Sequence, residues 1–220
     1  LQPSEFSKII MIIALAAMLE DRVGKLNTVS DILPVVGYVA LPFFLVLKQP
    51  DLGTSLVFIA ILLGMMFVAG VNLRILAAGF AAGIAASPLL WLFLKDYQKM
   101  RLKVFLDPSV DPLGSGYHII QSKIAIGSGL IFGKGLFGGT QSQLNFLPEN
   151  HTDFIFAVVG EELGFVGAAA LLLLYLVVLW RGVKIARDAS DTFGRLLAVG
   201  ITSMLAFHVL VNVGMTTGIM

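Results

Sequence analysis

The sequence lacks cysteine altogether and carries little charge. Only 13% of its 220 residues are charged, whereas soluble globular proteins average about 25%. Without cysteine, disulfide bonds and thiolate metal sites are excluded. The formal net charge of +1 does not supply the basic surface that nucleic-acid binding requires, so no nucleic-acid partner is expected. Apolar residues make up 57% of the chain and the mean hydropathy is +0.91, so lipid must solvate part of the surface.

Apolar segments divide the chain. Crossing a bilayer takes about 20 mainly apolar residues, and six segments reach or approach this length: 9–18, 32–47, 56–71, 75–94, 154–180 and 196–220. Pro34 and Pro42 predict a kink or an oblique path in the second segment. We therefore expect an all-α fold, a polytopic membrane helical bundle that forms a single domain over residues 1–220.

One long connection separates the fourth and fifth segments. Residues 95–152 are rich in Gly, Pro, Gln, Ser and charge, and a loop of this length is either functional or disordered. Within it, residues 117–126 mix apolar and polar side chains at helix-like spacing, which is typical of a helix lying along a membrane surface. We predict a structured loop that carries the chemistry.

The distribution of basic residues predicts the orientation. Alternate short connections carry Arg22, Lys25, Arg74, Arg181, Lys184, Arg187 and Arg195, whereas the opposite short loop carries only Lys48. Short loops rich in Lys and Arg stay in the cytoplasm. The loop 95–152 is therefore predicted to lie outside the cytoplasm.

A polar cluster stands directly before the fifth apolar segment. It consists of Glu149, His151, Thr152 and Asp153. An aspartate at a helix N-terminus is stabilised in its charged form, because the helix dipole is positive there. An ionised carboxylate at a membrane boundary can act as a general base, an effect worth about 100- to 10,000-fold in rate. The alternative is a plain helix cap, in which Thr152 or Asp153 satisfies free backbone amides.

Two pairs of charged residues fall inside predicted membrane helices. Glu5 and Lys8 are three residues apart on one helix face and are expected to pair. Glu161 and Glu162 fall two turns into the fifth segment, with Glu161 about 12 Å deeper than Asp153. Because charges within a membrane helix cost about 2.5–3.5 kcal/mol, we interpret all four as structural intramembrane charges, one glutamate lying in an interior hydrogen-bond network. Direct contact with substrate stays open as the alternative.

A series of motifs runs in order along nearly the whole chain. They are Gln2-Pro-Ser-Glu5, Gln49-Pro-Asp-Leu-Gly-Thr54, Asp96-Tyr-Gln98, Leu106-Asp-Pro108, Asp111-Pro-Leu-Gly114, Gly116-Tyr-His-Ile-Ile-Gln-Ser-Lys-Ile-Ala-Ile-Gly127, Gly133-Lys-Gly135, Gly139-Thr-Gln-Ser-Gln143, Thr152-Asp-Phe-Ile-Phe156 and Gly160-Glu-Glu-Leu-Gly164. In this combination the chain resembles the shape, elongation, division and sporulation (SEDS) family.

The resemblance implies a peptidoglycan glycosyltransferase. Members of the family polymerise glycan strands from lipid II at the outer face of the bacterial cytoplasmic (inner) membrane, in cell-wall elongation among other processes, beside a class B penicillin-binding protein. Lipid II, the nascent glycan strand, that transpeptidase and membrane lipids are the implied partners. The chain opens on Leu1 without a methionine, and family members have further helices at both ends, so we expect a fragment of a longer protein.

The resemblance also implies roles for individual residues. The essential aspartate of the family falls on Asp153, which would accept the proton of a sugar hydroxyl. The undecaprenyl diphosphate that leaves is anionic, so a lysine or a divalent cation such as Mg²⁺ beside it would stabilise it; no other cofactor is expected. Lys123 is favoured because it lies within a family-like motif. The remaining predicted substrate contacts are Gln121, Gln141, Glu149, His151 and Thr152.

Two alternatives from other classes stay open. A lipid II flippase would also need polar groups in membrane helices, but spread through the bilayer rather than gathered at one side. A noncatalytic scaffold for the penicillin-binding protein would leave Asp153 replaceable. Synthesis of glycan strands with an Asp153→Asn variant separates these interpretations from the enzyme.

Overall fold

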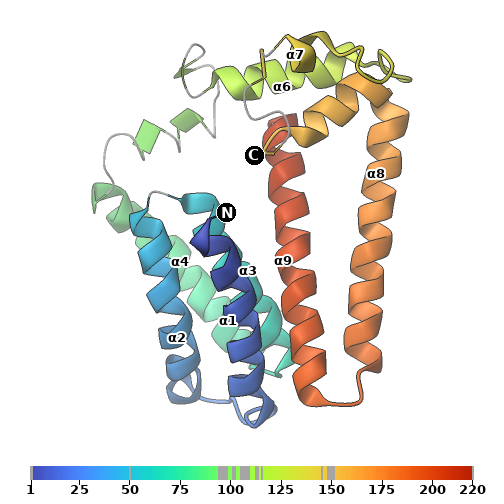
Figure 1. Cartoon of the computed structure of the whole chain (residues 1–220). Coiled ribbons are helices and arrows are strands. Elements are labelled where there is room, and N and C mark those ends of the chain that lie inside the picture. Colours follow the sequence, from blue (N-terminus) through green and yellow to red (C-terminus); the bar gives the residue numbers. More distant parts are fainter. Residues whose placement is uncertain are drawn as a thin grey trace. The chain divides into compact units, whose positions relative to one another are not determined.

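The computed structural model describes residues 2–49, 51–93, 99–100, 103–104, 110–111, 114, 116–144, 146–147 and 152–219. Within these ranges the chain is helical, without a strand (Figure 1). The helices are α1 (Pro3–Glu20), α2 (Val29–Lys48), α3 (Leu52–Val68), α4 (Leu73–Phe93), α6 (Tyr117–Ser128), α7 (Thr140–Gln143), α8 (Ile155–Asp188) and α9 (Thr192–Thr217). The predicted polytopic membrane helical bundle is confirmed.

Three helices are long and apolar enough to cross a membrane, namely α2, α8 and α9 among the described residues. Residues Gly53–Val68 and Leu73–Ala85 form shorter apolar helices. Helix α2 stays continuous through Pro34 and Pro42, and a capping box of Thr28 and Asp31 begins it. Its outward side chains Leu33, Leu41 and Phe44 are 66%, 68% and 62% exposed, as expected where lipid rather than water is the solvent.

The chain divides into two compact units. Unit 1 comprises Leu1–Ala86 and Val177–His208, and unit 2 comprises Ser87–Leu176 and Val209–Met220. Helices α8 and α9 each contribute to both units.

Unit 1 is built around α3. Phe58, Ile61 and Met65 lie on one face of this helix and are fully buried, in one core with Leu15 of α1 and Leu196 of α9. Helix α9 approaches closely at a glycine: a methyl group at Gly200 would lie 2.6 Å from a methyl carbon of Ile12. Small residues of this kind allow membrane helices to pack tightly where no hydrophobic effect drives them together.

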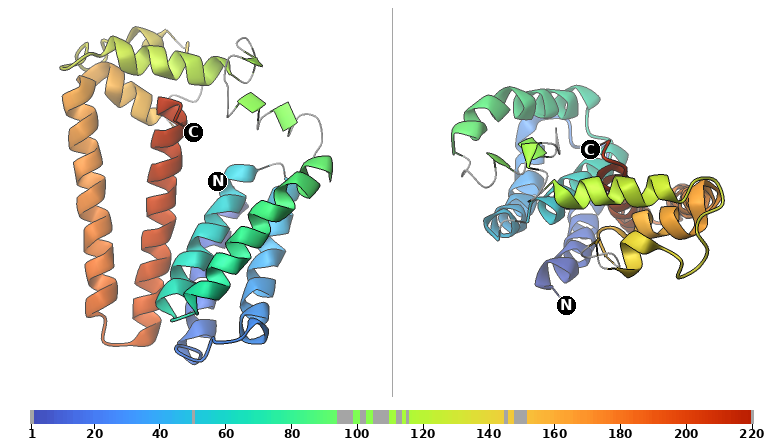
Figure 2. Two further views of the ribbon diagram at one scale, coloured as in Figure 1. Left: turned by 180° about the vertical axis from the view of Figure 1, so that it is seen from behind. Right: turned by 90° about the horizontal axis from the view of Figure 1, so that it is seen from above.

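The basic connections of unit 1 lie together. The α1–α2, α3–α4 and α8–α9 connections are at the same end of the unit (Figures 1 and 2). The amide of Gly24 donates to the carbonyl of Ala69 at 3.1 Å, which joins the first two of them. This is the arrangement that the charge pattern predicts for loops on one side of a membrane.

At the opposite end of α3, Asp51 caps the helix. Its carboxylate accepts from the Thr54 amide at 3.0 Å and from Gln2 Nε2 at 3.3 Å. Partial burial by itself would raise the pKa of Asp51, but the hydrogen bonds from Thr54 and Gln2 and the charge of Lys8 outweigh it and hold the pKa below its usual value. The cap fixes the motif Gln49–Thr54 to the start of α1.

Unit 2 contains a break that the sequence did not predict. Gly164 has φ +65° and ψ −163°, which divides α8 into a short limb, 155–163, and a long limb, 165–188. Only glycine adopts this conformation readily, and a Cβ there would collide with the backbone of Ile131 and Gly133. One straight helix over residues 154–180 is therefore not formed, and Glu161 and Glu162 lie in the short limb before the bend.

Candidate functional site

Helix α6 carries several of the predicted site residues in unit 2. The spacing of apolar residues predicted a helix here, and α6 confirms it. The buried Ser122 Oγ donates to the carbonyl of Thr216 at 2.7 Å, which ties α6 to the end of α9. Ala125 packs in a small core with Phe154 and Ala157 of the α8 start. Helix α6 is thereby held against both helices.

Asp153 lies in the turn that leads into α8, and its side chain is exposed. Its backbone is held at two points: Asn212 Nδ2 donates to the Asp153 carbonyl at 2.9 Å, and the next residue, Phe154, is only 7% exposed. The ring of His118 on α6 lies beside Phe154, with centroids 6.1 Å apart. An exposed carboxylate on a fixed backbone suits a proton acceptor better than a structural core residue.

The predicted α6 residues have different surroundings. Lys123 is exposed, and its side chain runs over Gly218, where an added methyl group would collide with the Lys123 Cε and Nζ atoms. Gln121 is half-buried on the same helix. Thr152 is exposed beside Asp153. Glu149 and His151 lie outside the described residues.

Glu161 is the centre of a hydrogen-bond network. Its carboxylate is 0% exposed and accepts from the Gln141 amide at 2.9 Å and the Ser142 amide at 3.1 Å. Lys134 Nζ donates to it at 2.9 Å, and Thr140 Oγ1 donates at 3.3 Å. A buried carboxylate is tolerated when it is paired and its oxygens are satisfied. The expected interior network is present, and it also caps the N-terminus of α7.

The same network includes Gln141, which the sequence placed near substrate, and a lysine of the α6–α7 loop. The backbone amide of Gln141 donates to the Glu161 carboxylate, and the Lys134 ammonium group forms an ion pair with the same carboxylate. The backbone reinforces this pairing, because the amides of Lys134 and Gly135 donate to the carbonyls of Glu161 and Glu162, each at 3.0 Å. Lys134 therefore has an acidic structural partner, and Lys123 is exposed on α6.

Unit 1 contains a separate charged group. Lys8 is 2% exposed, and its Nζ donates to Glu5 Oε1 at 2.8 Å and to His208 Nε2 at 3.0 Å. The expected Glu5–Lys8 pair is present, with the Glu5 side chain 54% exposed. The sequence analysis missed His208. Its signal was available, since it is the one ionisable residue in the apolar segment 196–220, and such residues usually line a functional site.

Comparison with known proteins identifies the family. The model of the FtsW, RodA and SpoVE family, described as cell cycle protein, matches residues 1–220. The chain belongs to this family. Together with its apolar helices, this makes it a multi-pass protein of a bacterial inner membrane.

Relatives within the FtsW/RodA/SpoVE family carry several names. The chain is 47% identical to peptidoglycan glycosyltransferase MrdB of Escherichia coli K12 and 43% identical to stage V sporulation protein E of Bacillus subtilis, and both matches cover all of this chain. It is 40% identical to the probable peptidoglycan glycosyltransferase FtsW of Trichlorobacter lovleyi. The chain spans 59%, 60% and 57% of these relatives, respectively.

A solved structure supports the same fold. It comes from work on the coordination of polymerization and crosslinking by a peptidoglycan synthase complex. The match has a TM-score of 0.77 at 34% identity and covers 99% of this chain and 60% of that one. At this identity the likeness extends beyond architecture to sequence.

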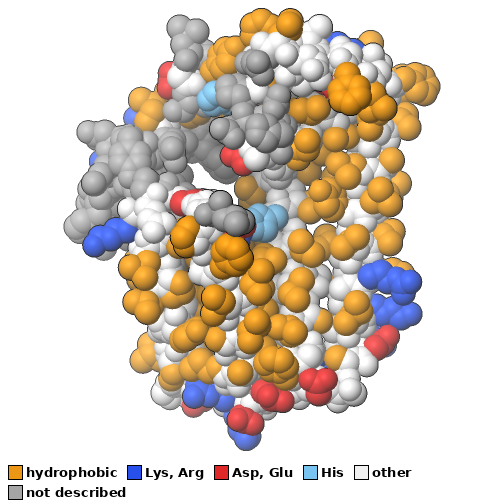
Figure 3. All heavy atoms as spheres, in the orientation of Figure 1, with side chains coloured by type: hydrophobic (Ala, Val, Ile, Leu, Met, Phe, Trp, Pro, Cys, Tyr) orange, Lys and Arg blue, Asp and Glu red, His pale blue; other side chains and the backbone are white. Residues whose placement is uncertain are grey.

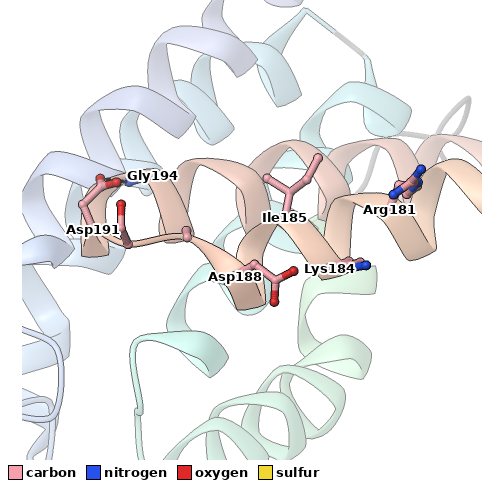
Figure 4. Close-up of a pocket in the computed structure, with 8 residues that line it drawn as sticks. Arg181, Lys184, Ile185, Asp188, Asp191 and Gly194 are labelled. Atoms are coloured by element: carbon pink, nitrogen blue, oxygen red, sulfur yellow. Dashed lines mark hydrogen bonds between the residues drawn. The ribbon is translucent and has the colours of Figure 1, made fainter.

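Neither a metal site nor a pocket is found at the predicted site residues that the structure describes. Among the residues that the structure describes, no group of three His, Asp or Glu side chains is placed to hold a metal ion. A pocket of about 630 Å³ lies in unit 1 at the α8–α9 turn. Figure 4 shows Arg181, Lys184, Asp188 and Asp191 around it, and none of the predicted site residues lines it. We therefore assign the candidate site to the surroundings of Asp153.

Proposed function

We propose that the full-length protein is a peptidoglycan glycosyltransferase that polymerises glycan strands from lipid II. Two supports combine: relatives bearing that name match the whole chain, and Asp153 is an exposed carboxylate on a backbone held by Asn212 and Phe154. The exposure of Asp153 carries the proposal, because a general base must reach the hydroxyl it deprotonates.

The reaction needs few groups. The acceptor sugar hydroxyl attacks the anomeric carbon of the donor, forming a new C–O bond as the bond to the diphosphate oxygen breaks. Asp153 takes the hydroxyl proton, and undecaprenyl diphosphate leaves with the bonding electron pair. No nucleotide is consumed.

Negative charge accumulates on the leaving diphosphate, so a cation beside it lowers the barrier. We propose Lys123 for this role, because it is exposed on α6, whereas Lys134 is paired with Glu161. A divalent cation such as Mg²⁺ would supply the same stabilisation and would be held mainly by the substrate. Gln121 and Thr152 would contact the sugars.

We further propose a RodA-type role in elongation and rod-shape maintenance rather than in division. This proposal is supported by the identity of 47% to peptidoglycan glycosyltransferase MrdB, against 40% to a relative named FtsW. The active site would face outward, and the partner would be a class B penicillin-binding protein that crosslinks the product. Restoration of rod shape by the full-length protein in cells depleted of RodA, without rescue of division in cells depleted of FtsW, is the expected result.

The decisive experiment measures glycan strands made from purified lipid II by the full-length protein. We expect Asp153→Asn to lower the rate about 100-fold or more, because it removes the proton acceptor while preserving shape. The matched control is Asp188→Asn, an exposed carboxylate at the other end of α8, and its rate should equal that of the wild type.

The same preparations distinguish the alternatives. Full polymerisation by Asp153→Asn would reject the base and leave the scaffold interpretation. If no variant and no wild-type sample polymerises lipid II, but all of them move it across vesicles, the protein is a flippase.

A further inference from the structure

The loop between α6 and α7 carries a group of strongly exposed apolar residues. We name it the apolar tip and define it as Leu130, Ile131, Phe132, Leu136 and Phe137, which are 78%, 59%, 81%, 70% and 82% exposed. Single exposed apolar residues are ordinary, but a contiguous group marks a contact with lipid or protein. Figure 3 shows apolar side chains along α8 up to the end where this loop lies.

The apolar tip is fastened to the Gly164 bend rather than loose. The amides of Phe165 and Val166 donate to the carbonyls of Leu130 and Ile131 at 2.9 and 3.1 Å. On its other side, the amide of Lys134 donates to the carbonyl of Glu161 at 3.0 Å. The tip is therefore hydrogen-bonded to α8 on both sides of the Gly164 bend.

The charged residue within the tip, Lys134, is exposed but paired, and 28% of its side chain is accessible. Lys134 falls between Phe132 and Leu136, but its ammonium group binds the buried Glu161 carboxylate at 2.9 Å. The apolar residues of the tip, which are 59% to 82% exposed, are therefore more accessible than the paired Lys134 side chain.

The backbone holds two of these side chains in an unfavourable conformation. Leu130 has φ +50° and Phe137 has φ +61°, in the left-handed region that favours glycine. Non-glycine residues persist there where the surroundings enforce it, and such positions concentrate at functional sites. Both residues are among the most exposed of the tip, so the strain serves to present them outward.

We propose that the apolar tip inserts into the membrane interface, in the outer leaflet by the orientation that the charge pattern predicts. The depth follows from its attachment, because Phe165 and Val166 are the first residues of the long limb of α8, which crosses the membrane. They are themselves 72% and 51% exposed. Aromatic and aliphatic side chains at this level partition into the boundary between headgroups and acyl chains. The tip would hold α6, α7 and the Glu161 network at the membrane surface, where a lipid-linked substrate arrives.

The test places a nitroxide label at position 137 of the full-length protein in lipid nanodiscs, without any partner protein. This chain has no cysteine, so Phe137→Cys adds a single labelling site to it, and cysteines elsewhere in the full-length protein are replaced. Collision rates with oxygen, which concentrates in lipid, and with a water-soluble nickel chelate are measured. The matched control is Gln143→Cys on α7, a polar exposed position nearby.

We expect the ratio of oxygen to nickel collisions to be higher at 137 than at 143. Equal ratios at both positions would place the tip in water and overturn the proposal. Low collision rates with both reagents at 137 would show that protein covers the tip, which also overturns it. Phe132→Cys repeats the measurement at a residue of the tip outside the strained pair, so that a folding defect of one variant does not decide the result.

Discussion

At the scale of single residues, burial of Glu161 and Lys8 is unfavourable, because both side chains are charged and lose almost all of their hydration. Each has partners that offset the loss of hydration. Glu161 accepts two backbone amides as well as Lys134, and Lys8 donates to Glu5 and His208. Buried charges with such partners are structurally demanding, because removal of one partner leaves the other unpaired.

We predict that Glu161→Gln destabilises the loop 129–144. The amide cannot accept from two backbone amides and also neutralise Lys134, and breaking a buried ion pair costs about 3–5 kcal/mol. Limited proteolysis of the full-length protein in detergent should show faster cleavage within this loop.

The control for this prediction is Glu20→Gln, at an exposed glutamate that ends α1. Its cleavage pattern should match that of the wild type. Wild-type protection of the loop in Glu161→Gln would show that the network is dispensable.

Some of the contacts between charged residues could be predicted from the sequence. The Glu5–Lys8 pair was predictable, because a spacing of three residues brings side chains together on any helix. The Lys134–Glu161 and Lys8–His208 contacts were not, because they join residues 27 and 200 positions apart. Only the packing of separate helices brings these groups within hydrogen-bond distance.

At the scale of elements, the hydrophobicity pattern did not predict the bend in α8. Hydrophobicity runs on through 154–180, so the sequence predicts one helix. Gly164 nevertheless breaks it, and on the bent backbone a Cβ at this position would collide with Ile131 and Gly133 of the α6–α7 loop. The consequence is that Glu161 and Glu162 lie where they can hydrogen-bond to the α6–α7 loop and the start of α7.

We predict that Gly164→Ala destabilises unit 2. The backbone conformation alone costs on the order of 1–3 kcal/mol for a residue other than glycine, and the collision with Ile131 and Gly133 adds to it. Thermal unfolding of the full-length protein in detergent measures the change.

Gly127→Ala is the matched control, because Gly127 is helical on α6 and an added methyl group there meets nothing within 4 Å. This variant should be unchanged or more stable by about 0.4–1 kcal/mol. Equal melting temperatures for the two variants would contradict the role given to the bend.

At the scale of the whole molecule, the placement of charge predicts how the protein sits in a membrane. The three basic connections at one end of unit 1 are expected in the cytoplasm and the loop 95–152 outside. Cysteine introduced by Ser190→Cys, in the exposed α8–α9 turn, should react with an impermeant thiol reagent only after the membrane is opened.

Lys103→Cys, at an exposed position of the long loop, serves as its counterpart and should react in intact spheroplasts. The reverse pattern would place Asp153 on the cytoplasmic side and remove the basis for synthesis at the outer face.

The sequence by itself determined the helical membrane fold, the family and the position of Asp153 at the start of α8. These follow from local properties: hydrophobicity sets where helices enter lipid, and a contiguous motif needs no tertiary contact to be recognised. Only the tertiary structure decided the bend at Gly164, the partners of Lys8 and the presentation of the apolar tip. Each depends on contacts between residues that are far apart in the sequence. Local sequence patterns do not specify such contacts.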